Sequence, residues 1–598
     1  MRILFITLFA GLLAATRAFA APLPEPVSAA LKHAHIPLSS VGIVVQGVNE
    51  TEPVVSLNAE RSMNPASTMK LLTTYASLET LGPAYRWNTE AYLDGKLEDG
   101  VLEGDLVFKG YGDPKLTLEQ FWMWLRELRQ RGLREIRGNL VLDHSFFEPV
   151  SENPAEFDND PTRAYNVGTD ALLLNFNALH LHLIPNGHET IAMLEPELDG
   201  YTVRNHITTS VKLHCGAEDS YRARLDGHDI VLEGKIPASC GEADDYFSLL
   251  PQDEYFFAVF SSLWKELGGT LLGKLRSGTA PAGQAPFSRY QSPQLSEVIR
   301  DINKFSNNIM ARQLFLTLGA AAPVMNPAES SQNAGNAQQS DGKDVSGVFS
   351  NPQANGSSSL LAEQEGGDTA DTDLTGARQP SGSPEGQASA VNIDVVTSEA
   401  GSAAVAGDPI AGARIDSATA TPPALAGRTP KPGNLLSSKP DAELTTPAGT
   451  PPRLGDLPAA NIVRSTAAMQ QWLKTQQLEF PELVLENGAG LSRKERISPL
   501  HLAALLQRAS SSPFYAELQA SLPILGLDGT VKKRFKDNEI AGYAHLKTGS
   551  LEGVKSIAGY VKARSGKQWI VVFLVNHPNA ALAQPAQDAL IEWLQKEH

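Results

Sequence analysis

The stretch that decides the fold lies near the C-terminus, where residues 543–576 read YAHLKTGSLEGVKSIAGYVKARSGKQWIVVFLVN. It contains three runs with the alternating or continuous apolar pattern of β-strands, namely 543–549, 555–563 and 568–576, and Ser565-Gly566 marks a turn between the last two. A helical pattern follows over 580–596. Strands joined by short turns and followed by a helix predict an antiparallel sheet with a helix packed on it.

The opposite end of the chain carries a matching pattern. Two β-branched runs, 41–48 and 53–57, predict a hairpin. A helix is predicted over 67–81, because the segment has no internal Gly or Pro and is followed by Gly82-Pro83. Hairpins at both ends of the chain with helices between them predict an α+β fold, in which one antiparallel sheet joins the first and last strands.

The segments between these ends differ in composition. Short β-type runs recur over 87–289, interrupted by one amphipathic helix at 118–131, which predicts an inserted mixed or mainly β module. Residues 321–457 are dominated by small and polar types and contain one aromatic residue, Phe349. Such a segment buries too little apolar surface to offset the entropy of ordering it, so we predict a disordered insertion rather than a small folded domain. A helical pattern resumes over 459–477.

Overall composition excludes several functions. The 598 residues carry a formal net charge of −17, which argues against nucleic acid as the main partner, since phosphate binding needs clustered Lys and Arg. Met1-Arg2, an apolar run over 3–15 and the small-x-small site at 18–20 predict a secretory signal peptide cleaved after Ala20. A membrane anchor is the alternative, but the run is shorter than the roughly 20 residues that span a bilayer. We therefore expect a soluble protein exported to the periplasm.

The two cysteines, Cys215 and Cys240, are the only ones in the chain. In an oxidising compartment a disulfide is the expected state of such a pair. Two separate buried thiols are the alternative. A metal site using the adjacent His214 lacks the further ligands that structural zinc needs, so no metal or other cofactor is expected.

Three short motifs carry the candidate chemistry. Ser67 and Lys70 stand one turn apart on a predicted helix start, where an amine of lowered pKa can take the hydroxyl proton. Ser306-Asn307-Asn308 precedes a helical run, and Lys547-Thr548-Gly549 lies in a predicted strand. Taken alone, each motif is also compatible with a purely structural role, as a helix cap, a surface lysine or a turn.

Together and in this order, Ser-x-x-Lys, Ser-x-Asn and Lys-Thr-Gly form the motif set of serine penicillin-binding proteins and β-lactamases. Ser67 and Ser306 are far apart in the sequence, and the stretches 64–67, 110–116 and 487–493 accompany the motifs. In these features the chain resembles the D-alanyl-D-alanine carboxypeptidase/endopeptidase family, that is, the class C, penicillin-binding protein 4-like proteins. The resemblance covers about 24–320 and 458–598 and implies a serine β-lactamase/transpeptidase-like fold. Together with the N-terminal pattern and the composition, it predicts the following order: 1–20 signal peptide; 21–86, 290–320 and 458–598 transpeptidase-like domain; 87–289 inserted module; 321–457 disordered insertion.

The resemblance also implies residue roles. Ser67 attacks the carbonyl between two D-alanines, or a cross-link, of peptidoglycan stem peptides, and Lys70 is the base. Ser306 relays the proton to the leaving amine. The remaining implied contacts are Asn308 with the substrate amide, Lys547, Thr548 and Gly549 with the terminal carboxylate and substrate backbone, and the amides of Ser67 and Ser550 with the oxyanion. β-Lactam antibiotics then act as inhibitors that trap Ser67.

Asp113 and Arg493 resemble the family's acidic and basic side-chain subsite, which suits the amine and carboxylate of diaminopimelate. The chain departs from the family at Asn487 and Ala489, where Asp and Ser are common, and at Glu552, where some members have Gln. Two alternatives stay open: a serine β-lactamase, although the Glu-x-x-Leu-Asn loop of class A enzymes is absent, and a degenerate wall-binding protein of the same fold. The oligomeric state is not predicted.

Overall fold

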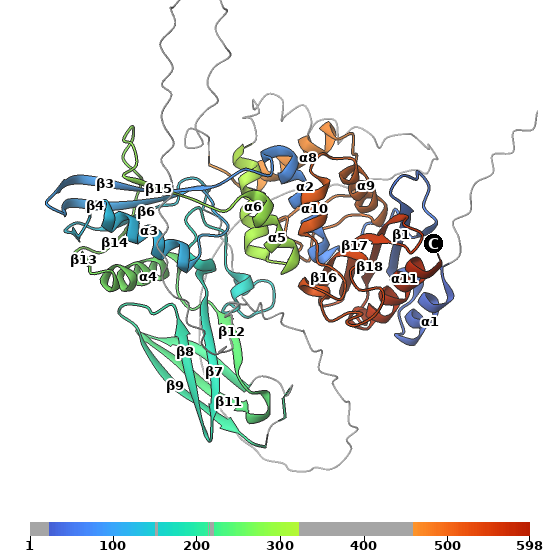
Figure 1. Cartoon of the computed structure of the whole chain (residues 1–598), viewed down its shortest axis with the longest axis horizontal. Helices are drawn as coiled ribbons and strands as arrows, with labels where there is room; N and C mark the ends of the chain where they lie inside the picture. Colours follow the sequence, from blue (N-terminus) through green and yellow to red (C-terminus); the bar gives the residue numbers. More distant parts are fainter. Residues whose placement is uncertain (1–22, 150–153, 213, 216–219, 322–458, 598) are drawn as a thin grey trace, which may run out of the picture. The chain divides into compact units, whose positions relative to one another are not determined.

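The computed structural model describes residues 23–149, 154–212, 214–215, 220–321 and 459–597 (Figure 1). The predicted signal peptide lies outside the described residues. So does the predicted disordered insertion, except for Ala321, which ends a helix. The domain boundaries that the sequence suggests stay predictions.

A five-stranded sheet joins the two ends of the chain, as the sequence predicts. Its strands, in spatial order, are β16 (Ala544–Leu551), β17 (Val554–Lys562), β18 (Gln568–Asn576), β1 (Val41–Gly47) and β2 (Val55–Leu57). All neighbours are antiparallel, and β1 pairs with β18 so that Val41 lies opposite Val575. The α+β prediction with one antiparallel sheet is therefore confirmed.

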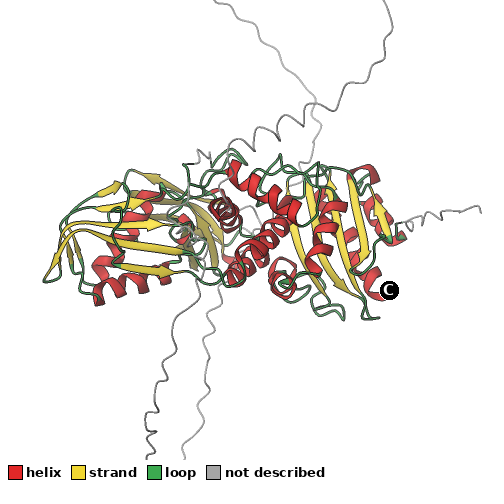
Figure 2. Cartoon of the chain, turned by 90° about the horizontal axis from the view of Figure 1, so that it is seen from above, coloured by secondary structure: helices red, strands yellow, loops and turns green. Residues whose placement is uncertain are grey.

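Helices cover both faces of this sheet (Figure 2). In β18, alternate residues face opposite sides: Ile570, Val572 and Leu574 belong to one core, and Val571 and Phe573 belong to the other. The first core is shared with α2 (Lys70–Leu81), α5 (Leu295–Lys304), α6 (Asn308–Ala321), α8 (Ile462–Thr475), α9 (Pro499–Ser510) and α10 (Tyr515–Ser521). The second is shared with α1 (Glu25–His33) and α11 (Gln584–Glu597). Each fully buried apolar side chain contributes about 1.5–3 kcal/mol, so the two cores hold the sheet firmly.

The predicted helix at 67–81 consists of two parts. A 3₁₀ turn, Ala66–Met69, precedes α2, and Gly82 ends the helix with a φ of 82°. Ser67 therefore lies in the tight first turn and not in the α-helix itself. Further 3₁₀ turns are η1 (Leu38–Ser40), η3 (Ala164–Asn166), η4 (Asn175–Asn177), η5 (Ala238–Cys240), η7 (Gly529–Val531) and η8 (Ala580–Ala583).

The segment between α2 and α5 forms two further sheets around one core. The first contains β3 (Asn88–Glu98), β4 (Val101–Gly110), β5 (Glu135–Ile136), β6 (Leu140–Asp143), β13 (Thr270–Leu271), β14 (Leu275–Ser277) and β15 (Ser288–Gln291). The second contains β7 (Leu179–Asn186), β8 (Glu189–Glu195), β9 (Thr202–Ser210), β10 (Ser220–Asp226), β11 (Asp229–Pro237) and β12 (Ala243–Phe247).

The prediction of a single helix in this segment was wrong. Besides α3 (Leu118–Gln130), the structure contains α4 (Gln252–Glu266). Its aromatic and β-branched run over 255–260 is locally strand-like. The helical period becomes visible only over about two turns, through Phe256, Phe260 and Trp264, which are all buried.

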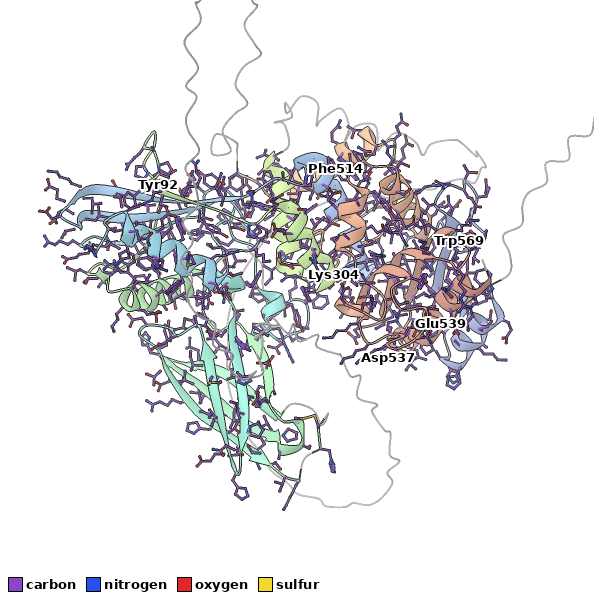
Figure 3. All side chains as sticks on the ribbon, viewed as in Figure 1. Tyr92, Lys304, Phe514, Asp537, Glu539 and Trp569 are labelled. Carbon is purple, nitrogen blue, oxygen red and sulfur yellow. A yellow bond between two sulfur atoms is a disulfide. The ribbon has the colours of Figure 1, made fainter. Side chains whose placement is uncertain are left out.

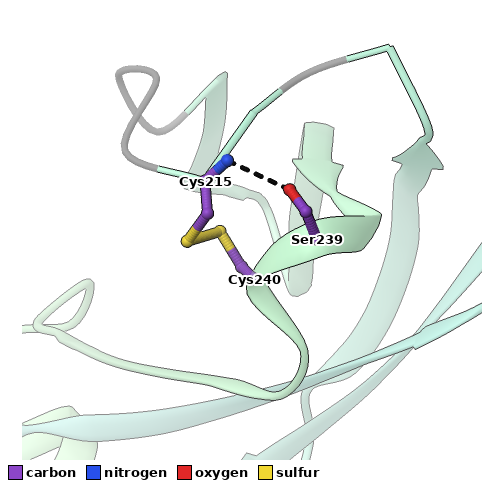
Figure 4. Close-up of a disulfide and its surroundings, with 3 residues drawn as sticks. All are labelled: Cys215, Ser239 and Cys240. Atoms are coloured by element: carbon purple, nitrogen blue, oxygen red, sulfur yellow. Dashed lines mark hydrogen bonds between the residues drawn. A yellow bond between two sulfur atoms is a disulfide. The ribbon is translucent and has the colours of Figure 1, made fainter.

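The disulfide expected from the sequence is present in the structure (Figure 4). Cys215 and Cys240 are joined with their Cα atoms 4.9 Å apart, and the Cys215 N–H donates to Ser239 Oγ at 3.0 Å. In the part of the chain that the structure describes, no helix is long and apolar enough to cross a membrane.

Candidate active site

The site is built around Ser67 and Lys70, where three segments distant in the sequence meet. Ser67 is partly exposed in the 3₁₀ turn, and Lys70 is fully buried at the start of α2. Lys70 Nζ lies 3.0 Å from Ser67 Oγ, 2.6 Å from Asn308 Oδ1 and 2.5 Å from the Ala489 carbonyl oxygen. The two residues thus form the hydroxyl–amine pair that their spacing predicts.

These contacts define what the Lys70 amine can do. The Asn308 and Ala489 oxygens only accept hydrogen bonds, so they occupy two N–H groups of Lys70. A neutral amine then has one lone pair left, and it is directed at the Ser67 hydroxyl. Burial lowers the pKa of Lys70 well below its ordinary value, and the nearby Lys547 lowers it further, while Glu495 opposes the shift. The environment therefore favours the form that can accept the Ser67 proton.

A second buried lysine faces a second serine. Lys547 Nζ on β16 donates to Ser306 Oγ at 2.8 Å and to the Thr548 carbonyl oxygen at 2.7 Å. Desolvation by burial lowers the pKa of Lys547 to about 7. Ser306 has a φ of 56°, in the left-handed region, between α5 and α6. This backbone turn aims its hydroxyl at Lys547, and Asn308 two residues later contacts Lys70.

The strand β16 passes very close to the turn that carries Ser67. A Cβ atom at Gly549 would lie 2.7 Å from the Ser67 backbone nitrogen and 2.3 Å from Ser556 Oγ, so only glycine fits there. Ser556 Oγ in turn donates to the Pro65 carbonyl at 2.6 Å, which fixes the turn against the sheet. On the neighbouring position, Thr548 Oγ1 bonds Thr530 Oγ1 at 2.7 Å.

Comparison with known proteins now identifies the family. The sequence model of the D-Ala-D-Ala carboxypeptidase 3 (S13) family matches residues 23–344 and 459–597, which together make up well over half of the chain. The chain belongs to the S13 family.

Two relatives and one solved protein illustrate the similarity to the S13 family. The D-alanyl-D-alanine carboxypeptidase DacB of Haemophilus influenzae is 25% identical over 46% of this chain, and the match spans 58% of that relative. A D-alanyl-D-alanine carboxypeptidase of an Actinomadura species is 21% identical over 95% of this chain and 83% of the relative. Two crystal structures of penicillin binding protein 4 from H. influenzae, one complexed with a β-lactam, superpose with TM-scores of 0.60 and 0.58, covering 95% of this chain and 99% of theirs at 19% and 18% identity. The fold is therefore the transpeptidase-like fold of penicillin-binding proteins, as expected.

The structure gives the two expected members of the acidic and basic subsite different surroundings. Arg493 is exposed, donates to the Glu552 carbonyl oxygen at 2.9 Å and to its carboxylate at 3.1 Å, and lies 5.1 Å over the Phe157 ring. Asp113 is only 3% exposed, and one of its oxygens accepts from the Lys115 N–H at 2.8 Å. Burial raises the pKa of Asp113 to about 7. The second carboxyl oxygen of Asp113 is buried and has no hydrogen-bond partner. The expected role of Asp113 and Arg493 in a side-chain subsite stays a prediction.

Sequence reasoning missed a buried carboxylate beneath the site. Glu495 Oε1 accepts the backbone N–H groups of Glu486, Asn487 and Gly488 at 3.2, 3.0 and 2.8 Å. These bonds hold the loop whose Ala489 carbonyl contacts Lys70. The signal was available: Glu495 is an acidic residue two positions before the apolar Ile497 and follows the Gly-Leu-Ser-Arg stretch that carries the resemblance.

Thr530 was missed as well, since it belongs to no motif, and the contact of Gly490 was missed although the residue lies in the 487–493 stretch. Thr530 is recognised only through its bond to Thr548, and a Cβ at Gly490 would lie 2.0 Å from the Ala66 carbonyl oxygen. Among the described residues, no group of three or more His, Cys, Asp or Glu side chains is arranged to hold a metal ion.

Proposed function

We propose that this S13 family member is a serine D-alanyl-D-alanine carboxypeptidase and DD-endopeptidase, which hydrolyses peptidoglycan stem peptides and their cross-links. The observation that carries the proposal is the position of Lys70 Nζ, within hydrogen-bond distance of Ser67 Oγ and of two oxygens that can only accept. The names of the curated relatives support the same activity.

The reaction follows from these contacts. Ser67 Oγ bonds to the carbonyl carbon of the penultimate D-alanine while Lys70 takes the hydroxyl proton. The oxyanion accepts from the backbone N–H groups of Ser67 and Ser550, and each such donor typically supplies about 3 kcal/mol. The C–N bond then breaks as Ser306 gives a proton to the leaving nitrogen, and Lys547 replaces it. The proton gained by Lys70 balances the one delivered from Lys547. Water then bonds to the acyl carbon and gives its proton to Lys547, while Lys70 returns its proton to Ser67 Oγ as the acyl bond breaks, so both lysines regain their starting forms.

Substrate orientation follows from β16. The terminal carboxylate lies at Lys547 and Thr548, the peptide backbone runs along Gly549, and the Asn308 amide group contacts the substrate amide. β-Lactams imitate the D-Ala-D-Ala end and acylate Ser67, which makes the protein an antibiotic target. We further propose that the segment over 1–20 directs export to the periplasm.

The test compares wild type with Ser67→Ala. Wild type should release D-alanine from a peptide ending in D-Ala-D-Ala and form a covalent adduct with fluorescent penicillin, located on Ser67 by mass spectrometry. Ser67→Ala should do neither while keeping its unfolding temperature. Fast nitrocefin hydrolysis without a lasting adduct would instead indicate a β-lactamase. Retention on peptidoglycan without any adduct would indicate a wall-binding protein.

A further inference from the structure

A polar cleft of about 350 Å³ opens next to the catalytic residues without containing any of them. Its walls include Arg300, Lys304 and Phe305 from the end of α5, Asp528 and Gly529 before η7, and Lys115 from the loop that follows β4. Figure 3 labels Lys304 at its place on α5. The cleft therefore combines side chains of the transpeptidase-like fold with one from the inserted segment.

The cleft adjoins one particular end of the substrate strand. Phe305 directly precedes Ser306, which contacts Lys547, and Gly529 directly precedes Thr530, which contacts Thr548. Both connections lead to the Lys547–Thr548 end of β16. The other end of β16 leads through Ser550 to Glu552 and the Arg493 side chain. Since Gly549 lies against Ser67, the scissile bond divides the two ends, and the cleft is on the side of the leaving group.

The charges of the cleft suit a leaving group that is larger than D-alanine. Lys115 pairs with Asp301 at 2.5 Å, and Lys304, only 4% exposed, pairs with Asp528 at 2.7 Å. Asp528 is itself fixed, because its Oδ1 accepts the Ile524 N–H at 2.7 Å.

Arg300 is exposed on α5 at the rim of the cleft. Its guanidinium makes no hydrogen bond or ion pair with another residue of the described ranges, so a carboxylate can reach it. Glu297 also lines the cleft. A wall with paired positive and negative groups, a further carboxylate and the Arg300 cation matches a peptide that carries both amine and carboxylate groups.

Resting on the proposed function, we propose that this cleft binds the leaving stem peptide of a cross-link, through the diamino-acid residue whose side-chain nitrogen departs. A D-alanine leaving group ends with its carboxylate at Lys547 and Thr548 and does not enter the cleft. The diamino-acid residue continues beyond that carboxylate, and its second centre, with the attached chain end, lies against Arg300 and the Lys304–Asp528 pair. The cleft thus favours cross-link cleavage without affecting removal of a terminal D-alanine.

The experiment uses the full-length protein and the variant Arg300→Glu. Three rates are measured: hydrolysis of a cross-linked muropeptide dimer, release of D-alanine from the monomeric pentapeptide, and acylation by fluorescent penicillin. Arg300→Glu should lower kcat/KM for the dimer at least about tenfold, mainly through KM, and leave the other two rates within about twofold. Lys474→Glu, a charge reversal at an exposed position of α8, is the matched control and should change none of the three.

The outcomes separate this inference from the proposed function. If Arg300→Glu leaves dimer cleavage unchanged, or lowers all three rates equally, the leaving-side role of the cleft is wrong and the proposed function stands. If wild type trims pentapeptide but does not cleave the dimer, both the leaving-side role and the proposed endopeptidase activity are wrong, and only the carboxypeptidase activity stands. If wild type neither trims pentapeptide nor forms a penicillin adduct, the proposed function itself fails. Arg300→Lys should restore most of the dimer activity, because it keeps the positive charge.

Discussion

Two substitutions of Glu495 separate its two roles, which are the hydrogen bonds that hold the loop and the effect of its charge on the pKa of Lys70. Its Oε1 holds three backbone N–H groups, and the loop they belong to presents the Ala489 carbonyl to Lys70 and the Gly488 carbonyl to Thr73 at 2.6 Å. In Glu495→Ala, three donors lose their acceptor in a buried place. At about 1–3 kcal/mol for each unsatisfied donor, partly recovered by water, we expect a loss of roughly 3–6 kcal/mol in unfolding free energy. Acylation should fall at every pH, because Lys70 loses a fixed partner.

Glu495→Gln keeps an oxygen at the same place and removes the charge. The loop should persist, with a loss of about 1–2 kcal/mol, since neutral acceptors form weaker hydrogen bonds than carboxylates. Burial raises the pKa of Glu495 itself, so its charge is present only above that raised pKa. Where it is present, the charge raises the pKa of Lys70, so its removal should lower that pKa further. Because Lys70 acts in its neutral form, the rising limb of acylation against pH should move to lower pH.

The measurement is the rate of penicillin acylation across the acidic and neutral range, combined with urea unfolding at one pH. Glu486→Gln is the matched control. Its carboxylate lies in the same loop, where it pairs with Lys494 at 2.6 Å and accepts from Ser492 Oγ at 2.5 Å. It should leave the rising limb in place. A rising limb that stays fixed in Glu495→Gln, or moves to higher pH, would refute the electrostatic reasoning.

Three further predictions concern Lys70, Lys547 and the segment over 322–458. Lys70→Arg should lose penicillin labelling almost completely, because a guanidinium stays protonated and cannot accept the Ser67 proton; labelling at the wild-type rate in a gel assay would exclude Lys70 as the base. Lys547→Met should lose activity but be more stable than wild type at low pH. The pKa of Lys547 is about 7 in the folded protein and 10.5 in the unfolded chain, so charging the buried amine costs stability that is fully lost below pH 7 and regained as the pH rises toward 10.5. Thermal unfolding at several pH values should therefore show a gap that narrows with rising pH, whereas a constant gap would contradict the assignment. Replacing residues 322–458 by a short linker should leave penicillin acylation intact, since longer loops cost only about 0.6 kcal/mol per doubling of length; loss of acylation by a variant that still folds would show that the segment contributes to the site.

A structural feature can be predicted from the sequence when the interactions that cause it lie between residues close together in the chain. The strands β17 and β18 could be predicted closely, because a period of two and turn residues are properties of adjacent positions. The position of Ser67 in a 3₁₀ turn could not, because the close approach of Gly549 and the Ser556–Pro65 bond, which come from the far end of the chain, hold that turn.

The same distinction applies to the candidate site. The motif residues Ser67, Lys70, Ser306, Asn308 and Lys547 meet in the structure as the motif set suggests, although their catalytic roles stay proposals. Residues outside the quoted motifs were missed. Glu495 matters because it accepts hydrogen bonds from three backbone N–H groups, and such bonds leave no pattern in the sequence. Asp113 resembled a substrate contact, and its burial is visible only in the folded chain.

The pairing of β1 with β18 determines when the enzyme can become active. Val41 and Val575 are neighbours in the sheet although more than 500 residues separate them along the chain. Contacts at such separation form late, because closing so long a loop costs entropy before the sheet stabilises it. Ser67 leaves the ribosome long before Lys547, which lowers the Lys70 pKa. A growing or truncated chain without β18 therefore carries Ser67 but lacks the strand that joins β1 to the β16–β17 hairpin and so brings Lys547 to the site.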